Sequence, residues 1–299
     1  MSKFLAALCA VIMACGMCYA EFSPTVGSQT LGLSAIGNAR ELGGYPSADG
    51  RTVKRGVLLR SAAPSDGTSS DFRVLTEKYN LAVMIDLRLD FERNKAQDPE
   101  LDDVENLHLS VMNMELTAPR MKKAAEYIDG NLGDADRKSM LIAIVKSGVI
   151  NDNFYVEILR GREGKAGYAE MFRKLLSMPE DKSLLFHCTQ GKDRTGIAAM
   201  LILSALDVDE KIIMSDYLLT NEFNAEKIAR EKQFVSTITD NDEEAEKYLF
   251  VMDHVSEAMM RRALDYLKNN YGSAKNYIIQ ELGITEEQIT ELQKKFLVH

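Results

Sequence analysis

The chain has 299 residues, of which 45% are hydrophobic and 27% are charged, with 19 glycines and 6 prolines. This composition is ordinary for a globular protein and argues against a disordered chain, a collagen or a protein that crosses a membrane many times. The 36 basic and 45 acidic side chains give a formal charge of −9 at pH 7. General DNA or RNA binding needs a basic face, so we do not expect nucleic acid as a partner.

The first twenty residues have the pattern of a secretory signal peptide. Lys3 is their only charged residue, an apolar stretch follows it, and small residues occupy the −3 and −1 positions of a cut after Ala20. We therefore expect an exported protein, periplasmic or secreted, with residues 21–299 as the mature chain. The alternatives are an uncleaved membrane anchor, for which the stretch is short, and lipoprotein anchoring at Cys15, whose preceding residues fit that pattern poorly.

Cleavage of the leader would leave Cys188 as the single cysteine, because Cys9, Cys15 and Cys18 precede the cut. One thiol cannot form an internal disulfide or a thiolate-rich metal site. Cys188 is therefore either an inert buried thiol or a reactive one, and its neighbours decide between the two.

The mature chain is expected to alternate strands and helices and then to become mostly helical. Apolar periodicity, caps and turn residues predict an extended arm over 21–37, a short hairpin around Ala48-Asp49-Gly50, helices over 68–79, 118–129, 136–146, 168–178 and 195–206, and strands over 81–86, 107–112 and 183–187. From Lys211 onward we expect only helices, including a long one over 243–271 and a last one over 285–297. The simplest arrangement is one α/β domain, residues 21–299, with a helix-rich C-terminal half.

The chemistry is expected in one ten-residue segment between a predicted buried strand and a predicted buried helix. It reads His187-Cys188-Thr189-Gln190-Gly191-Lys192-Asp193-Arg194-Thr195-Gly196. A short turn leading into a helix presents several backbone N–H groups and the positive end of the helix dipole to one point, which favours an anion. Arg194 adds a planar fork that can hold two phosphate oxygens. The same groups would stabilise a Cys188 thiolate placed for in-line attack on phosphorus, giving a phosphocysteine that water hydrolyses without metal or organic cofactor.

This segment resembles a known phosphatase signature. Cys, five residues, Arg and Thr is typical of the cysteine-dependent protein-tyrosine phosphatase superfamily, and the segment is most similar to bacterial tyrosine and phosphoinositide phosphatases with an HCxxGKDRTG loop. The resemblance implies a dual-specificity-phosphatase-like central sheet flanked by helices. It extends over further short motifs, in which Arg60 and Arg88 are expected to be structural: Asn38-Ala-Arg-Glu-Leu-Gly-Gly44, Leu59-Arg60-Ser61, Ile85-Asp86-Leu87-Arg88 with Glu92, residues 216–221 and residues 271–273.

The resemblance also implies roles for the loop residues 187–194 and for the threonine that follows them. Cys188 would be the nucleophile, Arg194 the phosphate clamp, and Thr195 the hydroxyl that supports the thiolate as leaving group in the second step. His187 adjoins the nucleophile in a strand, so its side chain points to the opposite face and is expected to order the loop by hydrogen bonding.

The general acid is a separate question, because the chain has no Trp and no Pro-Asp dipeptide and so lacks the Trp-Pro-Asp loop of many superfamily members. The resemblance places the acid at Asp193, whose carboxyl would protonate the leaving oxygen. Alternatively, Asp193 only pairs with a neighbouring cation, which leaves Asp98, Glu115 or Asp86. Lys192 is either a second pocket cation that engages further phosphates of an inositol ring or the charge balance for Asp193.

These residues predict a phosphomonoesterase that acts on phosphotyrosine, with phosphoserine, phosphothreonine or phosphoinositides as further substrates. The protein would contact a membrane surface only through a lipid substrate. The alternatives are a phytase-like hydrolase of inositol polyphosphates, a non-catalytic phosphate-binding module and a sulfurtransferase. The remaining histidines show no metal-ligand spacing.

Overall fold

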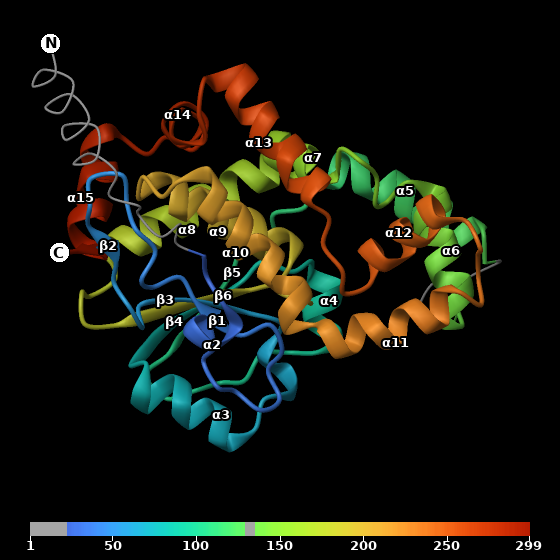
Figure 1. Ribbon diagram of the computed structural model, residues 1–299, viewed down its shortest axis with the longest axis horizontal. Helices are drawn as coiled ribbons and strands as arrows, with labels where there is room; N and C mark the ends of the chain where they lie inside the picture. The colour runs from blue at the N-terminus through green and yellow to red at the C-terminus, as the bar shows by residue number, and fades with distance from the viewer. Residues whose placement is uncertain (1–22, 129–134) are drawn as a thin grey trace, which may run out of the picture.

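The computed structural model describes residues 23–128 and 135–299 (Figure 1). The expected leader, residues 1–20, lies outside the described residues. None of the described helices combines the length and the apolar character needed to cross a bilayer.

A central sheet of five strands organises the described chain, in the order β1 (Arg40–Glu41), β3 (Leu58–Ser61), β6 (Ser183–His187), β4 (Leu81–Asp86) and β5 (Glu105–His108). The last four strands are parallel, and β1 runs antiparallel at one edge. The middle strand β6 is buried along its whole length, as expected for an apolar strand with covered faces. The register aligns Ser61, His187, Asp86 and His108 at the carboxyl ends of the parallel strands. Ligands of open α/β sheets bind at this edge.

Alternating side chains of β6 supply the two halves of the core. Leu184 and Phe186 belong to the large core with α9 (Asp193–Ala205), whereas Leu185 joins the smaller core with Leu75 of the segment η2 (Val74–Lys78). Figure 1 shows α8 (Arg162–Ser177), α9 and α10 (Glu210–Phe223) on one side of the sheet and α3 (Ser69–Arg73) on the other. The helix after β6 is thus buried in the centre of the larger layer, and its first turn lies at the carboxyl edge.

Four helices gather at one end of the molecule, at the right of Figure 1: α5 (Met114–Glu126), α6 (Arg137–Ser147), α11 (Ala225–Val235) and α12 (Asp242–Val251). They pack on one another in the pairs α5 with α6, α6 with α12 and α11 with α12. The remaining elements are α2 (Val26–Gln29), β2 (Thr52–Val53), η1 (Pro64–Asp66), α4 (Asp90–Lys95), α7 (Phe154–Arg160), α13 (Glu257–Tyr271), α14 (Ala274–Gln280), α15 (Glu286–Phe296) and β7 (Leu297–Val298).

Most of the predicted elements are present, with the predicted strands 81–86 and 183–187 matched residue for residue. The strand predicted over 107–112 is β5, which begins and ends earlier. Across the turn predicted at Ala48-Asp49-Gly50, Pro46 forms an antiparallel bridge with Thr52.

Two expectations for the C-terminal half are wrong. The single helix predicted over 243–271 is broken into α12 and α13, because the segment between them makes tertiary hydrogen bonds: the N–H of Val255 donates to Asn221 Oδ1 and its carbonyl accepts from Asn221 Nδ2. The region after Lys211 is not purely helical, because β7 pairs antiparallel with β2, far earlier in the chain.

Candidate active site

The signature segment lies where the sequence predicts it, between β6 and α9 at the carboxyl edge of the sheet. The turn depends on Gly191, which has a φ of +65°. A Cβ built there would lie 2.3 Å from the carbonyl oxygen of Ser61, so only glycine fits at this position.

The turn is anchored through its carbonyl oxygens. Asn38 Nδ2 donates to the carbonyls of Gly191 at 2.9 Å and Gln190 at 3.2 Å, and Arg60 Nη2 donates to Gly191 at 2.8 Å. In contrast, the backbone N–H groups of residues 189–192 donate no hydrogen bond to any group in the described part of the chain. The turn therefore has tethered carbonyls and a run of free amides, which is the arrangement that binds an anion.

A buried carboxylate holds the side chains that tether the turn. Asp216 on α10 accepts from Arg40 Nε at 3.1 Å, Arg60 Nη1 at 2.6 Å and the Tyr45 hydroxyl at 2.9 Å. Burial alone would raise the pKa of Asp216, but the two guanidinium groups and these hydrogen bonds hold it below its usual value. Arg40 also donates to Asn38 Oδ1. Arg60 therefore has the structural place that the sequence predicts.

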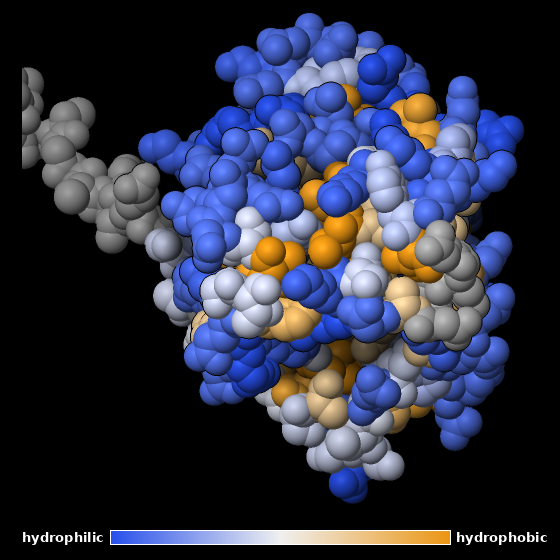
Figure 2. Space-filling model, turned by 90° about the vertical axis from the view of Figure 1, so that its right-hand side faces the viewer, coloured by the Kyte–Doolittle hydropathy of each residue, from blue (hydrophilic) through white to orange (hydrophobic). Residues whose placement is uncertain are grey.

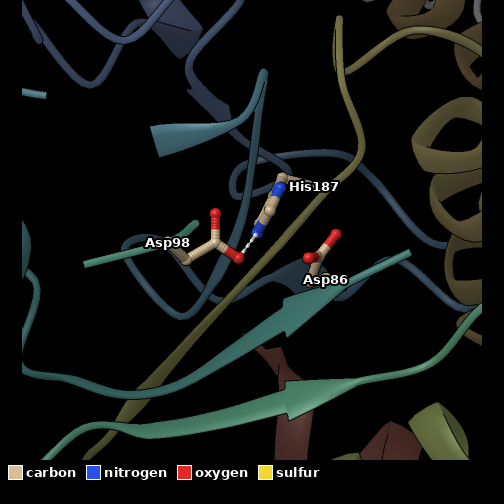
Figure 3. Close-up of side chains that lie close together, drawn as sticks. All are labelled: Asp86, Asp98 and His187. Atoms are coloured by element: carbon tan, nitrogen blue, oxygen red, sulfur yellow. Dashed lines mark ion pairs between the residues drawn. The ribbon is translucent and has the colours of Figure 1, made fainter. Parts of the chain in front are cut away.

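His187 is fixed on the other side of the loop (Figure 3). Its Nε2 lies 3.0 Å from Asp98 Oδ2, and the two side chains point toward one another. Arg88 joins the cluster, with Nη2 2.8 Å from Asp98 Oδ1 and Nε 2.9 Å from Asp86 Oδ1. His187 is buried with Asp98 as its ion-pair partner, and the expected ordering of the loop by its side chain stays a prediction.

The same cluster bears on the alternative acids and on metal binding. One oxygen each of Asp86 and Asp98 and one nitrogen of His187 lie within 4.8 Å of one another, close enough for a metal ion. Arg88 already supplies a positive charge to both carboxylates, so the donor set does not fit a further cation. Burial would raise the pKa of Asp86, but Arg88 and His187 hold it below its usual value. Glu115 is exposed in the first turn of α5.

Arg194 has a partner, Glu92, that the sequence singled out only as a member of a motif. Glu92 on α4 binds its guanidinium through two contacts, of 2.5 Å to Nη1 and 2.8 Å to Nη2, and also accepts from the Thr189 hydroxyl at 2.5 Å. Burial would raise the pKa of Glu92, but Arg194 lowers it to about 2. Arg194 is thus fixed at the loop, with its Nε not engaged by Glu92. One feature could have pointed to this contact: Glu92 lies in the first turn of a helix, where its Oε2 also accepts from the N–H of Leu89.

Asp193 and Lys192 contact residues outside the signature segment. The Tyr155 hydroxyl donates to Asp193 Oδ1 at 2.7 Å. Lys192 is 1% exposed, and its Nζ donates to the carbonyls of Phe250 and His254 and lies 3.6 Å from Asp193 Oδ2. The interpretation of Lys192 as a second pocket cation is therefore wrong, because its ammonium is held in the protein interior. The contact with Asp193 is at ion-pair distance but longer than a hydrogen bond, so both the charge-balance interpretation of Lys192 and the acid role of Asp193 stay predictions.

Cys188 and Thr195 complete the segment. Cys188 directly follows β6 and is 2% exposed. The Oγ1 of Thr195, in the first turn of α9, is buried and has no hydrogen-bond partner among the described residues. A buried hydroxyl without a partner is uncommon and requires an explanation.

Comparison with known proteins agrees with this geometry. The model of the tyrosine phosphatase family matches residues 31–298. This chain belongs to the tyrosine phosphatase family. The family resemblance predicted from the sequence is confirmed, and so is the mixed α/β fold.

Individual relatives in the tyrosine phosphatase family cover less of the chain. A protein of Cupriavidus necator provisionally named a tyrosine-protein phosphatase is 32% identical over 205 residues, which are 67% of this chain and 66% of the relative. The triple specificity protein phosphatase PtpB of Mycobacterium tuberculosis is 24% identical over 172 residues, 55% of this chain and 60% of the relative. A tyrosine-protein phosphatase of Nostoc commune is 22% identical over 263 residues, 83% and 76% of the two chains.

The surface of this tyrosine phosphatase family member carries exposed apolar side chains next to the sheet edge that holds the signature loop. Phe91 on α4 is 57% exposed, and Met114 and Leu116 in the first turn of α5 are each 37% exposed. Both helices follow strands whose carboxyl ends lie at that edge. Figure 2 faces the end of the molecule that carries α5, α6, α11 and α12 and shows hydrophobic patches among polar side chains there.

Proposed function

We propose that this protein is a cysteine-dependent phosphatase that hydrolyses phosphotyrosine in proteins. One observation carries the proposal: the free N–H groups of residues 189–192 lie between Cys188 and a fixed Arg194 at the carboxyl end of the central strand. This arrangement offers amide donors and a guanidinium to a phosphate beside the thiol, as phosphoryl transfer requires.

The reaction would have two steps. In the first, the Cys188 thiolate attacks phosphorus, the S–P bond forms as the P–O ester bond breaks, and Asp193 gives its proton to the leaving oxygen. In the second, water attacks the phosphocysteine and gives a proton to the Asp193 carboxylate, and the S–P bond breaks. The unpartnered Thr195 hydroxyl is available to donate a hydrogen bond to the departing sulfur. Arg194 and the loop amides would stabilise the charge on the transferred phosphoryl group in both steps.

Phosphotyrosine is placed first among the substrates for two reasons. The Lys192 ammonium is buried, so it is not available to bind the extra phosphates of an inositol ring. The exposed side chains of Phe91, Met114 and Leu116 offer an apolar surface near the loop for an aromatic ring. Phosphoserine, phosphothreonine and phosphoinositides are secondary candidates, and PtpB is named a triple specificity phosphatase.

The test compares the wild type with Cys188→Ser on a phosphotyrosyl peptide, a phosphoinositide in vesicles and inositol hexakisphosphate. We expect the wild type to prefer the peptide and the variant to lose turnover while still binding inorganic phosphate by calorimetry. Equal turnover by both proteins would reject the cysteine mechanism. Faster release of phosphate from inositol hexakisphosphate than from the peptide would favour the phytase-like alternative. Phosphate binding without turnover of any substrate would favour a non-catalytic module.

We further propose that the protein is exported after cleavage behind Ala20. Support comes from the apolar leader with its single Lys3. N-terminal sequencing of the protein recovered from the periplasm or the medium should begin at Glu21. A mature protein that retains the leader, or one that is lipid-modified at Cys15, would contradict this.

A further inference from the structure

The carboxyl group of Asp193 lies at one end of a buried chain of hydroxyl groups. The Tyr155 hydroxyl is 2.7 Å from Asp193 Oδ1 and 2.8 Å from the Tyr217 hydroxyl. Both tyrosines are 1% exposed, and their rings meet edge to face with centroids 6.0 Å apart. Asp193 therefore accepts from a hydroxyl on α7, which in turn contacts a hydroxyl on α10, and both tyrosines lie outside the signature segment.

The pKa values and the donor capacity of these groups determine which of them carry the protons in the row of hydroxyls. Burial, and after it the charge of Asp193, raise the pKa of Tyr155 and of Tyr217 well above the usual value, so both remain neutral donors at assay pH. A carboxylate can only accept, so Tyr155 donates to Asp193 Oδ1, and the Tyr155 oxygen is then available to accept from Tyr217. The other oxygen, Oδ2, is 3.6 Å from Lys192 Nζ, beyond hydrogen-bonding distance.

The tyrosine that contacts Asp193 is held on a well-anchored helix. Two residues beyond it on α7, Glu157 binds Arg120 of α5 through contacts of 2.5 Å and 3.0 Å. The Tyr277 hydroxyl donates to the carbonyl of Leu159 at 2.7 Å. The position of the Tyr155 hydroxyl is therefore fixed independently of the loop.

We propose that Tyr155 is a positioning residue for the general acid. Its hydrogen bond fixes the plane of the Asp193 carboxyl and leaves Oδ2 as the oxygen that carries the transferred proton. When the thiolate forms the S–P bond, the proton on Oδ2 moves to the ester oxygen as the P–O bond breaks, and Tyr155 continues to donate to Oδ1 of the resulting carboxylate. This inference rests on the proposed function, because it assigns a role around Asp193 in that reaction.

The test is the leaving-group dependence of Tyr155→Phe, which removes only the hydroxyl. We expect kcat/KM to fall about tenfold for phenyl phosphate, whose leaving group needs a proton, and by less than about threefold for 2,4-dinitrophenyl phosphate, whose leaving group does not. Binding of inorganic phosphate should not change. Tyr217→Phe should give a smaller loss with the same substrate dependence. An equal loss for both substrates would overturn the proposal, because a general structural defect would affect both alike.

A matched control and a double variant sharpen the result. Tyr248 is also buried and donates to a carboxylate, Glu244 Oε1 at 2.8 Å, but lies on α12 outside this chain of hydroxyls, so Tyr248→Phe should leave both activities unchanged. In an Asp193→Asn background, Tyr155→Phe should cost nothing further, and independent losses that multiply would overturn the inference. If Asp193→Asn shows the leaving-group dependence and Tyr155→Phe does not, the positioning role fails while the proposed function stands. If Asp193→Asn itself shows none, the acid assignment fails.

Discussion

Replacement of Asp216 by Asn should damage both the fold and the signature loop. The carboxylate accepts from Arg40 Nε at 3.1 Å and from Arg60 Nη1 at 2.6 Å, and both arginines are fully buried. Asparagine keeps the shape of the side chain and one acceptor oxygen but removes the charge. Two guanidinium groups would then remain in the interior without a counter-charge.

The expected cost follows from this burial. Removal of one partner from a buried ion pair typically lowers the free energy of unfolding by about 3–5 kcal/mol, because the remaining charge is uncompensated. Asp49 offers the matched control, since its ion pair with Arg51 is on the surface and its side chain is 49% exposed. Exposed pairs contribute little, so Asp49→Asn should leave stability nearly unchanged.

Chemical denaturation at pH 7, followed by far-UV circular dichroism, measures this difference. Because Arg60 also donates to the carbonyl of Gly191, we expect the Asp216→Asn protein to bind inorganic phosphate more weakly as well. The wild-type contribution has a defined pH dependence: the folded-state pKa of Asp216 is lowered, so its stabilisation is complete above the unfolded-state value and disappears as the pH falls through the folded-state value. A loss of less than about 1 kcal/mol, or one equal to that of Asp49→Asn, would refute the reasoning.

Three further substitutions test the loop. Glu92→Gln should raise KM and lower kcat/KM by about tenfold or more, because Arg194 loses a charge-assisted contact. The pKa of Glu92 is about 2, so the ion pair persists throughout an ordinary assay range of pH. Unchanged kinetics would argue against a role of Glu92 in holding Arg194. Thr195→Val should slow turnover and make a phosphoenzyme accumulate in rapid-quench experiments without loss of stability, because the hydroxyl has no partner among the described residues; a marked drop in melting temperature would instead indicate a structural hydroxyl. Gly191→Ala should lower the free energy of unfolding by about 2 kcal/mol or more and abolish phosphate binding. Gly283→Ala, with a similar φ of +68° and open space around it, should lower it by about 1 kcal/mol. Equal losses would show that the contact at Gly191 is unimportant.

The parts of the fold that the sequence predicts well are those determined by neighbouring residues. The strands 81–86 and 183–187 are short apolar runs between turn signals. The last helix was predicted over 285–297, and in the structure Thr285 caps it with both hydrogen bonds of a capping box with Gln288. The position of the signature loop followed in the same way, because a buried strand and a buried helix flank it.

The contacts that were not predicted join segments far apart in the chain. Arg194 and Glu92 are 102 residues apart, and Asp193 and Tyr155 are 38 apart. Tyr155 has no local pattern that distinguishes it from any other core tyrosine. For Lys192, charge alone suggested a place in the pocket, but the carbonyl groups exposed by the break between α12 and α13 hold its ammonium inside. Such positions depend on tertiary packing, which local patterns do not encode.

The tethered carbonyls of the signature turn have a consequence for the design of inhibitors. Because Asn38 and Arg60 hold Gln190 and Gly191 in place through side-chain hydrogen bonds, the amide donors are arranged before any ligand arrives. A rigid oxyanion such as vanadate should then associate with little loss of chain entropy, since the ordering cost was met during folding. Selectivity between family members would have to be sought in side chains outside these preformed amides.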